Sequence, residues 1–278
     1  MIAAAPGSAE GRSTAPGCST PRNPCATCGA CCRSYVVPVC GHDIWLITRE
    51  QRLSPEQFTV AHPLPGPHAE GFRLADDGQF FALALDKRGP FQLKRPCVFL
   101  VSLPGGHERC GIYSHRPVAC RAYPMVMRDD AIAFRERPLC PPDAWPDGEP
   151  SRPRWREAVG ELRMRFDTYA EVVARWNARV AATPGHRFTL GEYFGYLLSV
   201  YAQIAALDDQ LGTDALARLR STWRAVPGGA NGLAELRRRA EEYPWLAYLE
   251  RVAAIVAGFY PWVPSAGGGP LTLAVDPG

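Results

Sequence analysis

Hydrophobic side chains recur at helical spacing through the second half of the chain. The apolar positions step alternately by four and by three residues, at Trp155, Val159, Leu162, Phe166, Tyr169, Val173, Trp176 and Val180. Such a stripe predicts a long helix that buries one face against its neighbours. A row of aromatic and aliphatic residues of this kind is typical of a packed core.

Further helices are predicted after this stripe. Residues 189–192, Thr-Leu-Gly-Glu, form a capping box that opens a second helix. Its inward positions are predicted to be Tyr193, Leu197, Val200, Tyr201 and Ile204. A third helix is predicted over residues 214–224, and a fourth begins after Asn231 and is divided at Pro244. We therefore expect an antiparallel helical bundle over residues 151–260.

The first half carries short apolar runs separated by turn residues. Residues 72–85 and 125–134 each predict a β-hairpin, because a turn sequence stands between two apolar runs. Residues 97–101 predict another strand. The expected fold class is α+β: a small cysteine-rich unit with antiparallel hairpins, followed by an all-α helical bundle.

Two short helices and a loop are predicted before the first hairpin. A strand-like run at residues 35–39 leads to Asp43, which is expected to cap a helix with Ile44, Trp45 and Ile47 on its apolar face. Residues 54–57, Ser-Pro-Glu-Gln, form a capping box for a second short helix. Residues 61–71 are rich in Pro, Gly and His and predict a connecting loop with solvent-facing histidines.

Length and composition divide the chain into four parts. The 278 residues are enough for one large domain or two small ones. Residues 1–24 are rich in Ala, Pro, Gly and Ser and predict a disordered leader, and residues 261–278 predict a flexible tail. Between them we expect a cysteine-cluster metal-binding domain at 25–150 and the helical bundle at 151–260. No apolar run approaches the roughly 20 residues of a membrane helix, so no membrane association is expected.

Charge and the N-terminal composition bear on partners and compartment. The formal charge of +3 is carried almost wholly by arginine, because Lys87 and Lys94 are the only lysines. The arginines are scattered among acids, which predicts no nucleic-acid partner. The leader has no apolar segment after a basic start, so a cytoplasmic location is predicted, where thiols stay reduced. Asp208 and Asp209 are expected to be an exposed acidic pair.

Four thiols lie in one short stretch near the start of the chain. Residues 25–32 read Cys-Ala-Thr-Cys-Gly-Ala-Cys-Cys, which we call the first cysteine box. Cys-x2-Cys spacing brings two sulfurs to one side of a turn and suits a metal, and Cys-x2-Cys-x2-Cys is also the core of a bacterial iron–sulfur run. Gly29 supplies the permissive φ for the turn. Cys18, in the leader, is expected to be an ordinary thiol.

A second group of cysteines follows, with arginines beside it. Cys97 precedes the stretch from Cys110 to Cys120, and Cys140 follows it. Bound thiolates carry negative charge, so Arg116 and Arg121 are predicted to bind the cofactor as charge partners of the ligands. The alternative is that they are solvated surface charges. His115 is a further candidate ligand.

The predicted metal ligands are thus eight thiols: Cys25, Cys28, Cys31, Cys32, Cys97, Cys110, Cys120 and Cys140. Eight exceed the ligands of one tetrahedral zinc or one 4Fe–4S cluster, so there are two centres or some thiols are surplus. Neighbours in an extended segment point to opposite sides, so Cys31 and Cys32 are not expected to bind the same ion. The expected cofactor is an iron–sulfur cluster, 4Fe–4S by preference, or zinc, and the two groups of cysteines are expected to converge.

These motifs resemble the YkgJ-type cysteine-cluster family, which has a C-x2-C-x2-C-C signature. The first cysteine box fits that signature, residues 110–113 fit the family's middle segment, and residues 116–124 fit its R-P-x-x-C-R-x-Y-P motif. The resemblance covers about Cys25 to Cys140 and implies a zinc- or iron-chelating domain. Flagellin lysine methylases are similar in their cysteine motifs, which implies that the domain can hold an iron–sulfur cluster.

Three functions remain open on the sequence. The first is a metal-binding protein whose cluster or zinc has a redox or structural role. The second is an iron–sulfur enzyme that modifies a protein side chain, with an activity like that of a lysine N-methylase and a protein substrate. The third is a zinc-stapled domain that binds a protein partner. The sequence has no P-loop, dinucleotide, zincin or hydrolase motif, and whether it catalyses a reaction is left open.

Overall fold

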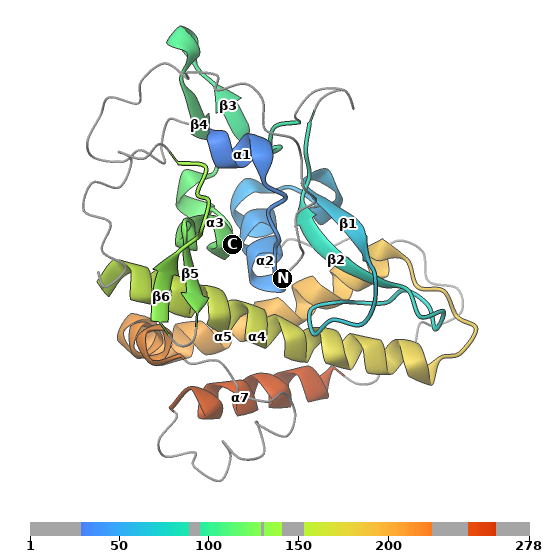
Figure 1. Cartoon of the computed structure of the whole chain (residues 1–278). Helices are drawn as coiled ribbons and strands as arrows, with labels where there is room; N and C mark the ends of the chain where they lie inside the picture. The colour runs from blue at the N-terminus through green and yellow to red at the C-terminus, as the bar shows by residue number, and fades with distance from the viewer. Residues whose placement is uncertain (1–28, 89–94, 129–130, 141–152, 224–243, 260–278) are drawn as a thin grey trace.

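The structure is a computed structural model that describes residues 29–88, 95–128, 131–140, 153–223 and 244–259 (Figure 1). The predicted leader and tail lie outside the described residues. The helices are α1 (Ala30–Ser34), α2 (Gly41–Gln51), α3 (Val118–Ala122), α4 (Pro153–Ala182), α5 (Leu190–Thr222) and α7 (Pro244–Gly258), with 3-10 turns η2 (Pro55–Gln57), η3 (Pro104–Gly106) and η4 (Tyr113–His115). The strands are β1 (Thr59–Leu64), β2 (Phe80–Leu85), β3 (Leu100–Ser102), β4 (Glu108–Cys110), β5 (Met125–Arg128) and β6 (Ala131–Phe134). The predicted α+β class is confirmed.

The strands of the described residues form three separate two-stranded antiparallel sheets. The pair β5–β6 confirms the hairpin predicted over residues 125–134. The strand predicted over residues 97–101 lies later, as β3, which pairs with β4. The predicted extended run at residues 35–39 hydrogen-bonds β2, where the N–H of Val39 donates to the carbonyl of Leu83 at 3.1 Å.

The first hairpin differs from the prediction. The partner of β2 is β1, so part of the predicted loop at residues 61–71 is a strand, and Phe72 makes only an isolated bridge to Phe81. The N–H of Phe81 donates to the carbonyl of Phe72 at 2.8 Å, and the carbonyl of Phe81 accepts the N–H of Phe72 at 3.0 Å. Both backbone groups of Phe81 therefore point away from β1. Pro63 is paired with Phe81, so it occupies a position of β1 where no N–H is needed. Proline was therefore a misleading sign of a loop here.

Helix α2 begins earlier than predicted. Its N-cap is Cys40, and Asp43 is the third residue of a capping box, in which the Asp43 carboxylate accepts the backbone N–H of Cys40 at 3.1 Å. The predicted capping box at Ser54 is confirmed, although it opens a single 3-10 turn, η2, through Gln57. Ile44 and Ile47 are buried, as predicted for the apolar face of this helix.

Helices α4 and α5 form an antiparallel pair at the base of the molecule, with α7 against both (Figure 1). Tyr169 of α4 bonds Tyr193 near the start of α5, whereas Arg165, earlier in α4, bonds Asp208, later in α5. The capping box predicted at Thr189 is confirmed, because the N–H of Thr189 donates to the Glu192 carboxylate at 2.7 Å. The predicted third helix continues from α5 across a kink at Gly212, which has a φ of 75°.

The hydrophobic core is shared between the two halves of the chain. One cluster of buried residues includes Ile44 and Phe72 from the first half and Tyr193 and Trp245 from the second. The rings of Phe72 and Tyr193 stack with centroids 4.0 Å apart. Figure 1 shows α2 standing over α4 and α5, which it contacts. The boundary predicted near residue 150 stays a prediction. Within the described ranges, no helix has the length and apolar character needed to cross a membrane.

Candidate metal centre

Six of the eight predicted ligands lie in the described residues, on five different segments. Helix α1 carries Cys31 and Cys32, Cys97 precedes β3, Cys110 ends β4, Cys120 lies within α3, and Cys140 follows β6. Cys25 and Cys28 lie outside the described residues, as does Cys18. Gly29 precedes α1 in the left-handed conformation, with a φ of 58°, as expected for the turn between the cysteines.

Backbone hydrogen bonds join the first cysteine box to the middle of the chain. The N–H of Cys97 donates to the carbonyl of Cys32 at 2.8 Å, so α1 and the turn before β3 touch. That turn is closed by the N–H of Leu100, which donates to the carbonyl of Cys97 at 2.9 Å. Leu100 pairs with Cys110 across the β3–β4 sheet. Three cysteine-bearing segments therefore lie side by side.

The Cys120 thiol interacts electrostatically with cysteines of these three segments. Burial raises the pKa of the Cys120 thiol well above its usual value, and the negative charges of Cys31, Cys97 and Cys110 raise that pKa further. The pKa of Cys97 is likewise raised by burial, against a hydrogen bond from the N–H of Phe99. The thiols of Cys31, Cys97 and Cys110 thus lie close enough to Cys120 for their negative charges to disfavour its thiolate. A bound cation would relieve this repulsion.

Cys31 and Cys32 lie in a helix, so the premise that they belong to an extended segment was wrong. Their side chains hydrogen-bond each other, and this bond is the first cause of the raised pKa of Cys31, followed by burial. Within the described ranges, no three His, Cys, Asp or Glu side chains form a group that could hold a metal ion.

Cys140 lies beside two tyrosines. The backbone N–H of Leu139 donates to the Tyr123 hydroxyl at 2.6 Å, and the Tyr123 ring meets that of Tyr35 edge-on with centroids 5.3 Å apart. The pKa of Tyr123 is raised by burial first, then by a hydrogen bond with Tyr35, and also by the charge of Cys140. These contacts hold the segment of Cys140 against the residue that follows α3.

A family model matches this cysteine-bearing part of the chain. Residues 24–141 match the CxxCxxCC family. Its description is "putative zinc- or iron-chelating domain". The resemblance seen in the sequence is confirmed over this stretch, and the match supports a zinc- or iron-chelating function for this part of the chain. No curated protein matches the chain. No solved structure matches it either. The likeness to flagellin lysine methylases stays a resemblance.

Two arginines within residues 24–141 have partners within the protein. The Arg116 guanidinium lies over the ring of Tyr113, 3.9 Å from its centroid, and its Nε donates to the Tyr113 carbonyl at 3.2 Å. Nη1 of Arg121 lies 3.1 Å from the carboxylate of Glu161 in α4. That these arginines also compensate the charge of a bound cofactor stays a prediction. His115 faces α2, where its ring contacts Gln51 at 3.4 Å.

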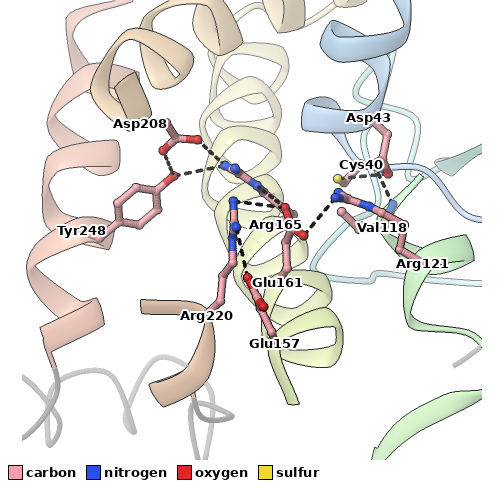
Figure 2. A network of polar contacts seen from close by, with 10 residues as sticks. All are labelled: Cys40, Asp43, Val118, Arg121, Glu157, Glu161, Arg165, Asp208, Arg220 and Tyr248. Carbon is pink, nitrogen blue, oxygen red and sulfur yellow. Dashed lines mark hydrogen bonds and ion pairs between the residues drawn. The ribbon is translucent and has the colours of Figure 1, made fainter. Parts of the chain in front are cut away.

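Arg121 is one end of a buried charge network that runs into the helical half (Figure 2). Glu161 also lies near Arg220, at 3.5 Å, and Arg165, at 3.9 Å. Arg165 donates to Asp208 at 2.6 Å, and the Tyr248 hydroxyl of α7 donates to the same carboxylate at 3.0 Å. The network therefore joins α3, α4, α5 and α7.

Asp208 corrects the prediction of an exposed acidic pair. It is buried, whereas Asp209 is exposed as expected. Burial lowers the pKa of the Arg165 guanidinium, but the charges of Asp208, Tyr248 and Glu161 outweigh it and raise that pKa overall. A buried carboxylate needs a charged partner. The partner of Asp208 is Arg165, which is distant in sequence, so no local pattern predicted that Asp208 is buried.

Asp43 fixes helix α3 to helix α2. Its buried carboxylate accepts the N–H and thiol of Cys40, the latter at 3.3 Å, and the N–H of Val118 at 3.0 Å (Figure 2). Val118 is the first residue of α3, so Asp43 satisfies a free donor at the helix N-terminus. Cys40 is therefore the buried N-cap residue of α2. The contact positions Cys120 and Arg121, which both lie on α3.

Lys87 is a residue of this site that sequence reasoning missed. Its ammonium donates to the carbonyl of Cys32 at 2.7 Å, and its backbone forms an isolated bridge with Cys97. Burial lowers the pKa of Lys87, whereas the charges of Cys97, Cys32, Cys31 and Cys120 raise it, in that order. One feature of the sequence could have drawn attention to Lys87, because lysine is rare in this arginine-rich chain.

Proposed function

We propose that residues 24–141 bind zinc or an iron–sulfur cluster through thiolates from both groups of cysteines, and that this centre has a structural role. The observation that carries the proposal is the hydrogen bond from the N–H of Cys97 to the carbonyl of Cys32. It places the end of the first cysteine box against the segment that leads to the second group. The match to a zinc- or iron-chelating family supports the same reading.

The donor set suits a thiophilic metal. Free Cys120 and Cys97 have raised pKa values because they are buried, so they hold their protons at neutral pH. A metal ion takes thiolates as ligands, and its binding therefore releases these protons and removes the mutual repulsion of the thiolates. The bound group would supply a cation that several thiolates can share.

The ligands are proposed to come mainly from the first cysteine box, with Cys25, Cys28 and Cys31, and to be completed by Cys110 or Cys120. The remaining thiols would form a second site or a redox reserve. Eight cysteines exceed what one zinc or one cluster requires.

The small size of these elements supports a structural role. Each sheet has two strands, and α1 and α3 have five residues each. Elements this short gain little stability by themselves. A centre that ties α1, β4 and α3 together would hold α3 in place, and with it the contact between Arg121 and Glu161.

The test is to purify the full chain without oxygen, record its ultraviolet–visible spectrum and measure bound metal. A brown protein with iron and sulfide indicates a cluster, and a colourless protein with stoichiometric zinc indicates zinc. The proposal is wrong if the protein contains neither metal and, in the presence of a thiol reductant, takes up neither zinc nor iron with sulfide.

A further inference from the structure

Lys87 lies where two of the cysteine-bearing segments meet. Its side chain reaches the carbonyl of Cys32, and the N–H of Cys97 donates to that same carbonyl at 2.8 Å. The backbone of Lys87 in turn bridges the backbone of Cys97. One carbonyl oxygen thus receives the ammonium and the N–H of a predicted ligand, so Lys87 is fixed relative to both segments.

The ammonium of Lys87, held at the carbonyl of Cys32, lies near thiols of both cysteine groups. Its ammonium is within electrostatic range of Cys31 and Cys32 in the first box and of Cys97 and Cys120 in the second group. The two arginines beside Cys120 are already engaged, Arg116 with Tyr113 and Arg121 with Glu161. Lys87 is therefore a cation whose contacts are with the cysteine-bearing segments themselves.

We infer that Lys87 is a positioning residue of the metal centre: its ammonium fixes α1 through the Cys32 carbonyl and offsets the negative charge of the gathered thiolates. This inference rests on the proposed function. Four thiolates around one divalent cation leave two negative charges, and a partly buried ammonium nearby stabilises that state. An ammonium suits this place because it is a compact charge on a long stem that can turn several donors toward its neighbours.

The two contributions of Lys87, a hydrogen bond and a charge, can be separated by substitution. Lys87→Gln keeps an N–H donor and removes the charge, Lys87→Met removes both, and Lys87→Arg keeps both. If the charge matters, Lys87→Gln behaves like Lys87→Met and Lys87→Arg restores binding. A purely structural hydrogen bond would instead make Lys87→Gln resemble the native protein.

The experiment measures Zn²⁺ affinity of the metal-stripped full chain by competition with a coloured chelator, without oxygen and with a reductant. We expect Lys87→Gln and Lys87→Met to bind Zn²⁺ about 10- to 100-fold more weakly and Lys87→Arg to stay within about threefold of the native chain. The matched control is Arg88→Gln, which removes one positive charge from the next residue, whose side chain is exposed. It should leave the affinity unchanged.

The outcomes separate this inference from the function on which it rests. If the native chain binds Zn²⁺ tightly and Lys87→Gln binds it equally well, the role of Lys87 is refuted and the metal centre stands. If the native chain binds neither Zn²⁺ nor iron, both are refuted. Thermal unfolding of each metal-free variant shows whether it folds. A loss of affinity in Arg88→Gln as large as in Lys87→Gln would also refute a specific role for Lys87.

Discussion

Replacing Glu161 by Gln should strongly destabilise the protein, because the single negative charge of Glu161 is shared by three guanidinium groups in a largely buried place. Its side chain is 10% exposed, and it lies 3.1 Å from Arg121, 3.5 Å from Arg220 and 3.9 Å from Arg165. The amide has no charge, so Arg121 would lose its ion pair with residue 161, whereas Arg165 would keep Asp208 and Arg220 would keep Glu157.

The size of the effect follows from burial. Removing one partner of a buried ion pair costs about 3–5 kcal/mol of unfolding free energy. Arg121 and Arg220 keep 31% and 19% of their side chains exposed, so water can solvate part of the unpaired charge. We therefore expect a loss near the lower end, about 3 kcal/mol, which for a chain of this size lowers Tm by roughly 6–12 °C.

The matched control is Glu157→Gln on the same helix. Glu157 pairs with Arg220 at 3.6 Å, but its side chain is 51% exposed. Exposed pairs contribute about 0–1 kcal/mol, so this variant should unfold almost like the native protein. The two variants make the same chemical change and share a partner, and they differ mainly in burial.

The assay is urea unfolding followed by tryptophan fluorescence, because Trp155, Trp176, Trp223 and Trp245 are buried in the helical half. Metal content is measured for each variant, since Arg121 adjoins the predicted ligand Cys120. Equal free energies of unfolding for Glu161→Gln and Glu157→Gln, at equal metal content, would refute the reasoning.

Three further predictions concern the cysteine-bearing half. Removing the metal from the full chain should lower Tm, since the short segments lose their common anchor, and superimposable melting curves before and after complete metal loss would contradict a structural role. Cys120→Ser should reduce bound metal and Tm together, whereas Cys18→Ser should change neither in the same two measurements. Asp43→Asn should cost about 1–3 kcal/mol in urea unfolding, because the amide has one acceptor oxygen for the donors that the carboxylate serves. Burial raises the pKa of Asp43 above 3.8, so folding favours its protonated form. The difference in unfolding free energy between the native chain and Asp43→Asn should therefore shrink as pH rises through that raised pKa. A difference that grows with pH would contradict this.

The helical half was predictable because its signals are local. The stripe from Trp155 to Val180 and the capping box at Thr189 each lie within one helix, and both are confirmed. The hairpin at residues 125–134 is equally local, because its two paired strands are close neighbours in the sequence. Such features depend on spacing and on the chemistry of neighbouring residues, which the sequence states directly.

The predictions were wrong where a residue distant in the sequence determines the local structure or burial. Pro63 suggested a loop, but Phe72 takes the hydrogen bonds of Phe81 and leaves Pro63 a place in a strand. Asp208 was predicted to be exposed, but it is buried and accepts a hydrogen bond from Arg165 of α4. For the candidate site, the sequence predicted the cysteines as ligands, whereas the contact between Lys87 and Cys32 depends on how the segment after β2 meets α1.

The stacking of Phe72 on Tyr193 also limits how the chain can be divided. Phe72 is fully buried, and its ring lies against a residue that comes more than a hundred positions later. Ile44 belongs to the same buried cluster as Trp245. A fragment that ended near residue 150 would carry every cysteine but would present these apolar side chains to water, where they favour self-association. A substitution on either side of this shared core must therefore be accommodated by the side chains of the other side.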